Sequence, residues 1–385
     1  MNKISRNLII LLSFFLVAGC QWRGGEKKQL AAETVSQSDS VGVPGNPVYA
    51  SGWQITRQNG VRLLTIHDPQ RSSGQNYKFA LVPRDLSNPQ IPEGYTVIKL
   101  PVQRVICMTT LQLSNFIRLD ATSNVVGITS TRHLFNERMQ QQLKSGHTAK
   151  IGIEGNFNNE MVMALSPDII LISPYKRGGY DVLKDVDIPL VPHLGYKEMT
   201  PLAQAEWIRL MGILLGEEEK ADAAFSQIEK RYTELKNLVK DVEKRPVVFS
   251  GELHGGNWYA VGGQSFLAQL FRDAGADYFL KDNKASGGVT LDFETIYSQA
   301  DQADYWRILN SYNGKYTYDV LKDSDERYAD FKAFKNKKVI YCNLREKPYY
   351  EMMPVAPECL LGDFIKVFHP DLLPDYEPVF YELLR

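Results

Sequence analysis

The sequence predicts an α/β fold, in which two Rossmann-like lobes with mostly parallel sheets are joined by a single long α-helix. Three observations lead to this prediction. Short apolar runs alternate with helical stretches from about residue 104 to 200, and the same alternation resumes at Pro246. Between these two regions, apolar residues recur at helical spacing over 217–242. Alternating strands and helices indicate parallel sheets with crossover helices. A small N-terminal β-hairpin region precedes both lobes.

The first 20 residues read as a secretory signal peptide. Lys3 and Arg6 precede an apolar run, Leu8 to Val17, that is too short to span a membrane. Small residues then lead into Cys20, and this ending resembles a bacterial lipobox. The lipobox implies removal of residues 1–19 and a lipid, such as palmitate, on Cys20. The alternative is an ordinary signal peptide that happens to end near a cysteine. In both cases the folded part lies outside the cytoplasm, which favours capture, binding or hydrolysis.

Composition excludes some classes of function. Removal of Lys3 and Arg6 lowers the formal net charge from −1 to −3, and no basic tail is present, so we expect no nucleic-acid partner. We also expect no resident cofactor. Beyond Cys20, an odd number of cysteines remains, which rules out a full disulfide framework. Cys107 and Cys342 lie in apolar runs and read as small buried hydrophobic residues. A bridge between Cys342 and Cys359 stays open.

The N-terminal part of the mature chain divides into a tether and an extension. Residues 20–47 are polar and rich in Gly, Ser and Gln, which predicts a lipidated flexible tether. Over 48–99, two strand-like runs flank Asn59-Gly60, a strong signal for a β-hairpin. Residues 77–82 can add another strand. The sequence does not indicate what this extension does.

The lobes and the helix between them follow in order. The first α/β lobe covers 100–200, with strands expected at 104–108, 125–128, 168–172 and 190–191. A helical segment covers 201–244, and its second part, 217–242, has one apolar stripe along a helix of roughly 38 Å. The second α/β lobe covers 245–385. The stripe predicts a helix long enough to run along both lobes.

The two predicted lobes also share a weak internal echo. Asn159-Glu160 opens a predicted helix that is followed by an Asp and a strand. Phe293-Glu294 opens a second predicted helix, which is also followed by an Asp and a strand. Each lobe therefore carries a glutamate near a helix start. Two similar α/β lobes are a natural way to build a cleft.

At this point the chain resembles a known family, the periplasmic binding proteins for siderophores, haem and vitamin B12, over about residues 100–375. The motifs that carry the resemblance are Asn159-Glu160-Met-Val-Met-Ala-Leu-Ser-Pro-Asp-Ile-Ile-Leu, Gly216-Glu-Glu-Glu-Lys-Ala, Gly262-Gly-Gln-Ser-Phe, Leu291-Asp-Phe-Glu294 and Phe364-Ile-Lys-Val-Phe-His-Pro-Asp-Leu-Leu-Pro. The extension over 49–95 is not part of the usual family pattern.

The resemblance implies a function. It predicts a periplasmic substrate-binding protein of an ABC importer, anchored to a membrane by lipidated Cys20, that captures an iron-siderophore or haem and delivers it to an inner-membrane permease. A corrinoid such as vitamin B12 is the alternative ligand. The family also implies that Glu160 and Glu294 contact arginines of the permease. The competing interpretation is that both are first-turn acids favoured by the helix dipole.

Ligand contacts are expected beyond the carboxyl ends of the predicted strands, where open α/β sheets bind ligands. The residues placed there are Arg132, His133, Glu154, Asn156, Tyr175, Lys176, Arg177 and Tyr196 in the first lobe, and His254, Trp258, Tyr259, Tyr312, Arg345, Tyr349 and Tyr350 in the second. From these we select as ligand-binding residues Arg132, His133, Tyr175, Arg177, Trp258, Tyr259, Arg345 and Tyr349. Aromatic faces suit a large planar or macrocyclic ligand, and arginines bind carboxylates, catecholates or phosphates through a bidentate fork. This set therefore favours an anionic metal chelate.

Three lesser alternatives are retained. His133, His193 and His254 would hold a bare metal ion if they met across the cleft, although no metal-ligand spacing is present. Ser265 would serve a tethered hydrolase, but the surrounding sequence fails the Gly-x-Ser-x-Gly pattern, and a helix cap is the simpler role. A lipoprotein that only scaffolds other proteins is the third.

Overall fold

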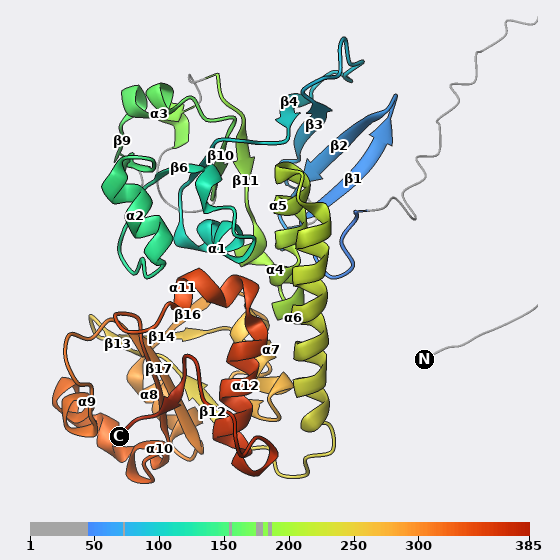
Figure 1. The fold of residues 1–385 in the computed structure, drawn as a ribbon. Helices are drawn as coiled ribbons and strands as arrows, with labels where there is room; N and C mark the ends of the chain where they lie inside the picture. Colours follow the sequence, from blue (N-terminus) through green and yellow to red (C-terminus); the bar gives the residue numbers. More distant parts are fainter. Residues whose placement is uncertain (1–44, 72–73, 154–155, 175–179, 184–186) are drawn as a thin grey trace, which may run out of the picture. The chain divides into compact units, whose positions relative to one another are not determined.

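The computed structural model describes residues 45–71, 74–153, 156–174, 180–183 and 187–385 (Figure 1). The predicted signal peptide, Cys20 and most of the predicted tether lie outside these residues. So do two of the predicted ligand contacts, Tyr175 and Arg177.

The extension folds into a four-stranded sheet, the N-terminal sheet. Its strands in spatial order are β1 (Trp53–Gln58), β2 (Val61–Ile66), β3 (Tyr77–Pro83) and β4 (Thr96–Leu100). The predicted hairpin is confirmed, because β1 and β2 pair antiparallel around Asn59 and Gly60, which both have positive φ angles as a two-residue hairpin turn requires. The pairing of β3 with β4 is parallel, so the extension is a small mixed sheet and more than a hairpin.

The first lobe contains a five-stranded parallel sheet, with the order β11-β10-β5-β6-β7. The strands are β5 (Val105–Cys107), β6 (Val125–Ile128), β7 (Ala149–Lys150), β10 (Ile169–Ile172) and β11 (Leu190–Pro192). The helices are α1 (Thr110–Arg118), α2 (Glu137–Ser145) and α3 (Asn159–Leu165), and β8 (Gly152–Ile153) pairs with β9 (Asn156–Phe157). The short strands are buried on both faces, as in parallel sheets covered by helices.

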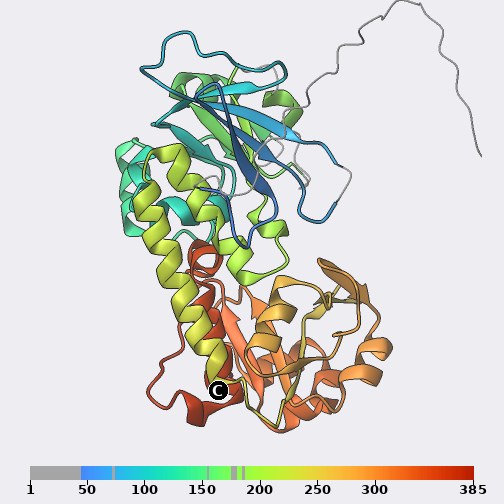
Figure 2. The ribbon, with the colours of Figure 1, turned by 90° about the vertical axis from the view of Figure 1, so that its right-hand side faces the viewer.

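Three helices connect the lobes: α4 (Pro201–Ala205), α5 (Trp207–Leu215) and α6 (Glu218–Leu238). Gly216 ends α5 with a φ of +72°. Gly212 lets α5 and α6 approach closely, because a Cβ at this position would lie 2.3 Å from the Cβ of Ala221. α6 packs against both α5 and α12 (Pro357–Phe368) of the second lobe (Figure 2). It ends four residues before the predicted limit of 242.

The second lobe has a five-stranded sheet in the order β15-β12-β17-β18-β19, parallel except for β18 with β19, and a three-stranded antiparallel sheet in the order β13-β14-β16. The strands are β12 (Val247–Ser250), β13 (Glu252–His254), β14 (Asn257–Val261), β15 (Asp277–Tyr278), β16 (Gly288–Leu291), β17 (Tyr305–Asn310), β18 (Val339–Asn343) and β19 (Glu382–Leu383). The remaining helices are α7 (Phe266–Asp273), α8 (Phe293–Ala300), α9 (Tyr318–Ser324), α10 (Lys332–Lys335) and α11 (Tyr349–Met352). As predicted, Ser265 caps α7, and its hydroxyl accepts from the N–H of Ala268.

Two buried glutamates connect the segment before the N-terminal sheet to the region of the helices between the lobes through hydrogen bonds. Glu206 accepts hydrogen bonds from the N–H groups of Val48, Tyr49 and Ala50 at 2.8, 2.6 and 2.8 Å. Glu198 accepts from the N–H of Gly52 at 2.9 Å and from the indole of Trp207 at 3.0 Å, among other donors. Leucine, isoleucine and tryptophan side chains of β1 and β2 join the same apolar core as α5 and α6.

The cysteine predictions are settled for the part of the chain that the structure describes. Cys107 and Cys342 are buried, and burial raises the pKa of both thiols. Cys359 is also a free thiol, so it forms no bridge with Cys342. Across the described ranges, no helix combines the length and apolar character needed to cross a membrane.

Candidate functional site

The candidate site lies between the lobes. The loop that follows β6 of the first lobe meets there the loops that follow β17 and β18 of the second lobe. A pocket of about 320 Å³, here the interlobe pocket, has a lining that consists of Thr131, Arg132, His133, Leu134, Phe135 and Arg345. This volume lies at the lower end of the range for small-molecule sites, roughly 300–1,000 Å³. The structure therefore brings together three of the predicted ligand contacts: Arg132, His133 and Arg345.

His133 contacts the second lobe from the loop of the first. Its Nε2 lies 3.2 Å from the hydroxyl oxygen of Ser311, which follows β17. Its ring centre lies 6.3 Å from that of Tyr350 on α11. The backbone of His133 has a φ of +61°, a left-handed conformation that is uncommon for a residue with a side chain. The imidazole is therefore placed at the junction by an unusual turn after β6.

The interlobe pocket is electrostatically positive. Arg132 and Arg345 are exposed, and within the described residues neither forms an ion pair with a carboxylate. The Arg345 Nε donates to the carbonyl oxygen of Ser311 at 3.3 Å, which leaves most of its donors available. Burial lowers the pKa of His133, and the charges of Arg132 and Arg345 lower it further. At neutral pH the imidazole is thus neutral, and the two guanidinium groups set the charge of the pocket.

A buried carboxylate holds the pocket loop against the second lobe. Glu351, on α11, is 3% exposed and accepts from the N–H of Phe135 at 2.7 Å and from the N–H of Asn136 at 3.1 and 3.2 Å. Asn136 is the N-cap of α2, so the carboxylate also lies at a helix start, where negative charge is favourable. Burial raises the pKa of Glu351. These bonds join α11 of one lobe to the loop of the other.

Two predicted ligand contacts, Trp258 and Tyr349, are wrong in this structure because both side chains are buried in the core. Trp258 is fully buried, its rings pack beside Phe249 and Trp306, and its indole donates to the carbonyl oxygen of Ser250. Tyr349 is 6% exposed and packs edge-on against Tyr381. Both residues stabilise the second lobe.

Tyr259 points the other way on the same strand as Trp258. It is 49% exposed, and its ring lies 5.9 Å from that of His254. It does not line the interlobe pocket, so its role as a ligand contact stays a prediction. Tyr175 and Arg177 also stay predictions, because they fall outside the described residues.

The three histidines of the metal-ion alternative do not meet. His193 is buried against Trp207, with ring centres 4.9 Å apart, and burial lowers its pKa to about 4. Its Nε2 lies 3.2 Å from the Asn115 amide nitrogen. His254 is exposed at the end of β13. Over the ranges that the structure describes, no group of three or more His, Cys, Asp or Glu side chains could hold a metal ion.

The sequence reasoning missed Ser311, Phe135 and Glu351. Ser311 directly follows β17, so the rule that selected the other strand-end residues applies to it as well. Phe135 lies only two residues from His133. Glu351 carried no signal, because a glutamate in a short helix is ordinarily exposed.

The two predicted docking glutamates are in equivalent local positions. Glu160 lies in the first turn of α3, which Asn158 caps, and Glu294 lies in the first turn of α8, which Asp292 caps. Both side chains are exposed. In the part of the chain that the structure describes, neither takes part in a salt bridge. Their geometry fits both the docking prediction and the helix-dipole interpretation.

Comparison with protein families and curated proteins gives a coherent result. A family model described as "Periplasmic binding protein" matches residues 105–345. Two curated relatives come from Methanocaldococcus jannaschii. The uncharacterized lipoprotein MJ0878 is 23% identical over 298 residues, which cover 73% of this chain and 69% of the relative. The uncharacterized lipoprotein MJ0872 is 25% identical over 307 residues, which cover 77% and 76%.

Solved structures show the same fold at low sequence identity. A periplasmic binding protein from Veillonella parvula has a TM-score of 0.58 and 14% identity, with 83% of this chain and 99% of that chain covered. A periplasmic heme binding protein from Pseudomonas aeruginosa has a TM-score of 0.57 and 17% identity, covering 72% and 96%. A protein of an ABC-type Fe3+-hydroxamate transport system from Saccharomonospora viridis has a TM-score of 0.55 and 17% identity, covering 70% and 94%.

Proposed function

We propose, from the premise that this chain belongs to the periplasmic binding protein family, that it captures an iron chelate, either a siderophore or haem, for a membrane permease. Proteins of this family bind a solute and deliver it to the permease of an ABC importer, so the chain is a solute-binding protein and not an enzyme. The choice of ligand is the proposed step.

The observation that carries the choice of ligand is the pair of guanidinium groups in the interlobe pocket. Arg132 and Arg345 come from different lobes, and both lack a carboxylate partner among the described residues. An arginine fork binds the paired oxygens of carboxylates and catecholates, so an anionic chelate would complete both sets of donors. Two proteins of the same fold are described as binding heme and as belonging to Fe3+-hydroxamate transport, which supports this ligand class.

The test is a thermal-shift panel on a chain that starts at residue 21. The described fold begins at Gly45, so this chain retains all of it. Ferric siderophores, haem and cobalamin are compared, and a specific ligand at a hundredfold excess over its Kd stabilises the fold by about 2.7 kcal/mol. A shift with cobalamin alone would replace the iron chelate with a corrinoid. The absence of any shift would refute the proposed ligand class.

Variants then place the ligand. Arg132→Gln and Arg345→Gln should each weaken binding about thirtyfold, because a paired charge is worth roughly 2 kcal/mol. Lys322→Gln is the matched control, since it removes the same charge from an exposed position on α9 of the second lobe. If both arginine variants bind as tightly as the control, the site does not lie at the interlobe pocket. A loss in only one variant would place the ligand mainly on that lobe.

Delivery to the permease is proposed to use Glu160 and Glu294. Exposed charges at an interface mainly set encounter and orientation, so Glu160→Arg and Glu294→Arg should leave ligand Kd unchanged and lower uptake. Glu377→Arg, an exposed glutamate on the C-terminal segment, is the control for the charge change. If the variant with both substitutions supports wild-type uptake, Glu160 and Glu294 do not dock to the permease, and the helix-dipole interpretation holds for both.

A lipid on Cys20 is proposed as the anchor at the membrane. The two curated relatives are named as lipoproteins, which supports this part of the proposal. Anchoring would place the protein on the periplasmic side of a membrane, near its permease.

A further inference from the structure

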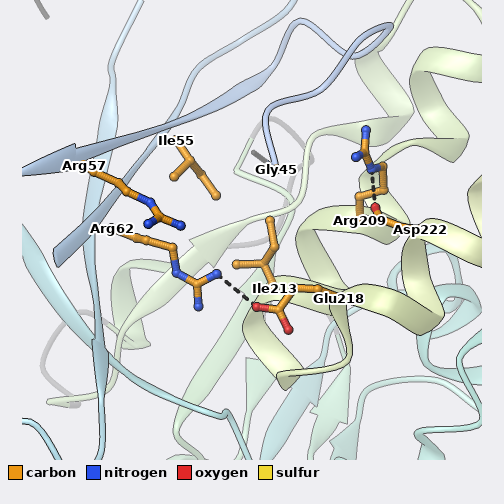
Figure 3. A pocket seen from close by; sticks show the side chains of 8 residues that line it. All are labelled: Gly45, Ile55, Arg57, Arg62, Arg209, Ile213, Glu218 and Asp222. Carbon is orange, nitrogen blue, oxygen red and sulfur yellow. Dashed lines mark hydrogen bonds and ion pairs between the residues drawn. The ribbon is translucent and has the colours of Figure 1, made fainter. Parts of the chain in front are cut away.

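A second pocket lies away from the interlobe pocket, between the N-terminal sheet and the helices that connect the lobes. Its volume is about 260 Å³, and we call it the hairpin pocket (Figure 3). Its lining consists of Gly45, Ile55, Arg57, Arg62, Arg209, Ile213, Glu218 and Asp222. The interlobe pocket has a different lining, so the hairpin pocket is a separate feature of the fold.

The hairpin pocket contains a pair of arginines that face each other across two strands. Arg57 of β1 and Arg62 of β2 are direct partners in the antiparallel register. They lie on the same side of the hairpin as Ile55, the side that faces α5 and α6 (Figure 3). Like charges directly opposite in a sheet are destabilising. A further group that neutralises them would remove this cost.

The carboxylates in and beside the hairpin pocket pair with only two of its three arginines. Arg209 pairs with Glu206 at 3.1 Å and with Asp222 at 2.7 Å, and Arg62 pairs with Glu218 at 3.0 Å. Arg57 has no hydrogen-bond or ion-pair partner within the described ranges. Its guanidinium extends beside that of Arg62 toward Glu218 and Ile213 (Figure 3). With Glu206 included, the three carboxylates equal the three arginines in number, but all of them pair with Arg62 or Arg209, and the guanidinium fork of Arg57 has no partner among the described residues.

We propose that the hairpin pocket binds a phosphate-type anion, with Arg57 as the bidentate donor and Arg62 as the second cation. A guanidinium fork matches two phosphate oxygens, and the pocket is large enough for such a group. The buried side chains of Ile55 and Ile213 give the pocket an apolar part, which suits a phosphate carried on an apolar group.

Two sources can supply this anion, a membrane phospholipid or free phosphate. Gly45 lines the pocket and is the first described residue after the predicted tether. Cys20, the proposed site of the lipid, lies 25 positions before Gly45 in the sequence. A chain anchored through Cys20 would thus keep the hairpin pocket close to lipid headgroups. This source depends on the proposed anchor, whereas free phosphate does not.

The first experiment titrates inorganic phosphate into the chain from residue 21, at constant ionic strength with chloride as the balancing salt, and follows thermal stability. We expect saturable stabilisation, with an apparent affinity at least tenfold weaker in Arg57→Gln. Arg57→Lys keeps the charge but not the fork, so we expect an intermediate affinity. Lys99→Gln is the control, because Lys99 is exposed on β4 of the same sheet.

The second experiment measures sedimentation of the same proteins with vesicles of phosphatidylcholine alone or with phosphatidic acid added. Binding to the acidic vesicles that Arg57→Gln loses, and that Lys99→Gln keeps, identifies a lipid headgroup. Phosphate binding that depends on Arg57 without vesicle binding identifies the free anion. Equal behaviour of Arg57→Gln and the control in both experiments overturns the proposal. Chelate affinity, measured in parallel, should be unchanged in Arg57→Gln, which separates this site from the proposed import function.

Discussion

Replacement of Glu351 by alanine is expected to weaken both the stability of the protein and its affinity for ligand. The carboxylate is 3% exposed and accepts from two backbone N–H groups, those of Phe135 and Asn136, in the loop that also carries His133. A buried donor that loses its acceptor costs about 1–3 kcal/mol, so two donors cost roughly 2–6 kcal/mol in total. Water that enters the space left by the side chain would move the cost toward the lower value.

The effect on ligand binding follows from the position of this link. If the loop with Arg132 and His133 leaves its place, the fraction of molecules with a complete interlobe pocket falls, and the apparent Kd rises in proportion. A loss of about 2 kcal/mol would correspond to a weakening of at most about thirtyfold. Glu351→Gln keeps one acceptor oxygen, so we expect it to fall between alanine and wild type.

Urea unfolding and ligand titration check this prediction, with Glu377→Ala as the control. Glu377 is an exposed glutamate in the same lobe, so its loss should change the free energy of unfolding by less than about 0.5 kcal/mol. If Glu351→Ala unfolds like this control and binds ligand with wild-type affinity, the carboxylate does not hold the lobes together and the reasoning fails.

Four further predictions follow. Cys20→Ser should abolish incorporation of labelled palmitate and release the chain from the membrane fraction; retention in that fraction would contradict lipidation. Because an anion beside His133 would raise the depressed pKa of that imidazole, chelate affinity should increase as the pH falls through the interval between the pKa of the complex and that of the free protein, and His133→Gln should remove this slope in a pH titration. Glu206→Ala should expose residues 48–50 to limited proteolysis, since it removes the acceptor of three N–H groups and costs about 3 kcal/mol or more. Solution scattering with and without ligand should show little change in lobe angle, because α6 is one continuous helix; closure by tens of degrees would contradict a stiff connection.

The periodic parts of the fold could be predicted from the sequence. The five residues of the stripe from Ala221 to Leu235 are all buried on α6, as the helical spacing requires. The end of the helix was placed too late because Val239 is also buried, although it lies beyond Leu238 in the C-cap. A spacing pattern reports which residues are buried, and it does not distinguish a last helical turn from the turn that follows.

The attachment of the N-terminal sheet could not be predicted. Asn59-Gly60 specifies the hairpin locally, because both residues tolerate the positive φ angles of the turn. Glu206 looks like an ordinary polar residue at the junction of two helices. It is buried only because three N–H groups about 157 positions earlier in the chain turn toward it. Such a contact depends on tertiary structure and produces no periodic pattern in the sequence.

The candidate site was predicted with unequal success, and the reason lies in the chemistry of the side chains. The strand-end rule places a residue along the chain but does not say which way its side chain points. Trp258 and Tyr259 are neighbours on β14, yet one is fully buried and the other is half exposed. An aromatic side chain satisfies either position, because its ring packs in a core and its polar atom needs only one partner, as the Trp258 indole finds in Ser250.

Arginine leaves less freedom than an aromatic residue, because a guanidinium carries a permanent charge and five donors. A buried arginine needs partners, as Arg307 finds in the hydroxyl and ring of Tyr381. An arginine at a strand end without such partners remains at the surface, available to an anion. Arg132 and Arg345 meet this condition in the interlobe pocket, and Arg57 meets it in the hairpin pocket. The same criterion, a guanidinium without a carboxylate nearby, therefore connects the proposed import function with the proposed phosphate site.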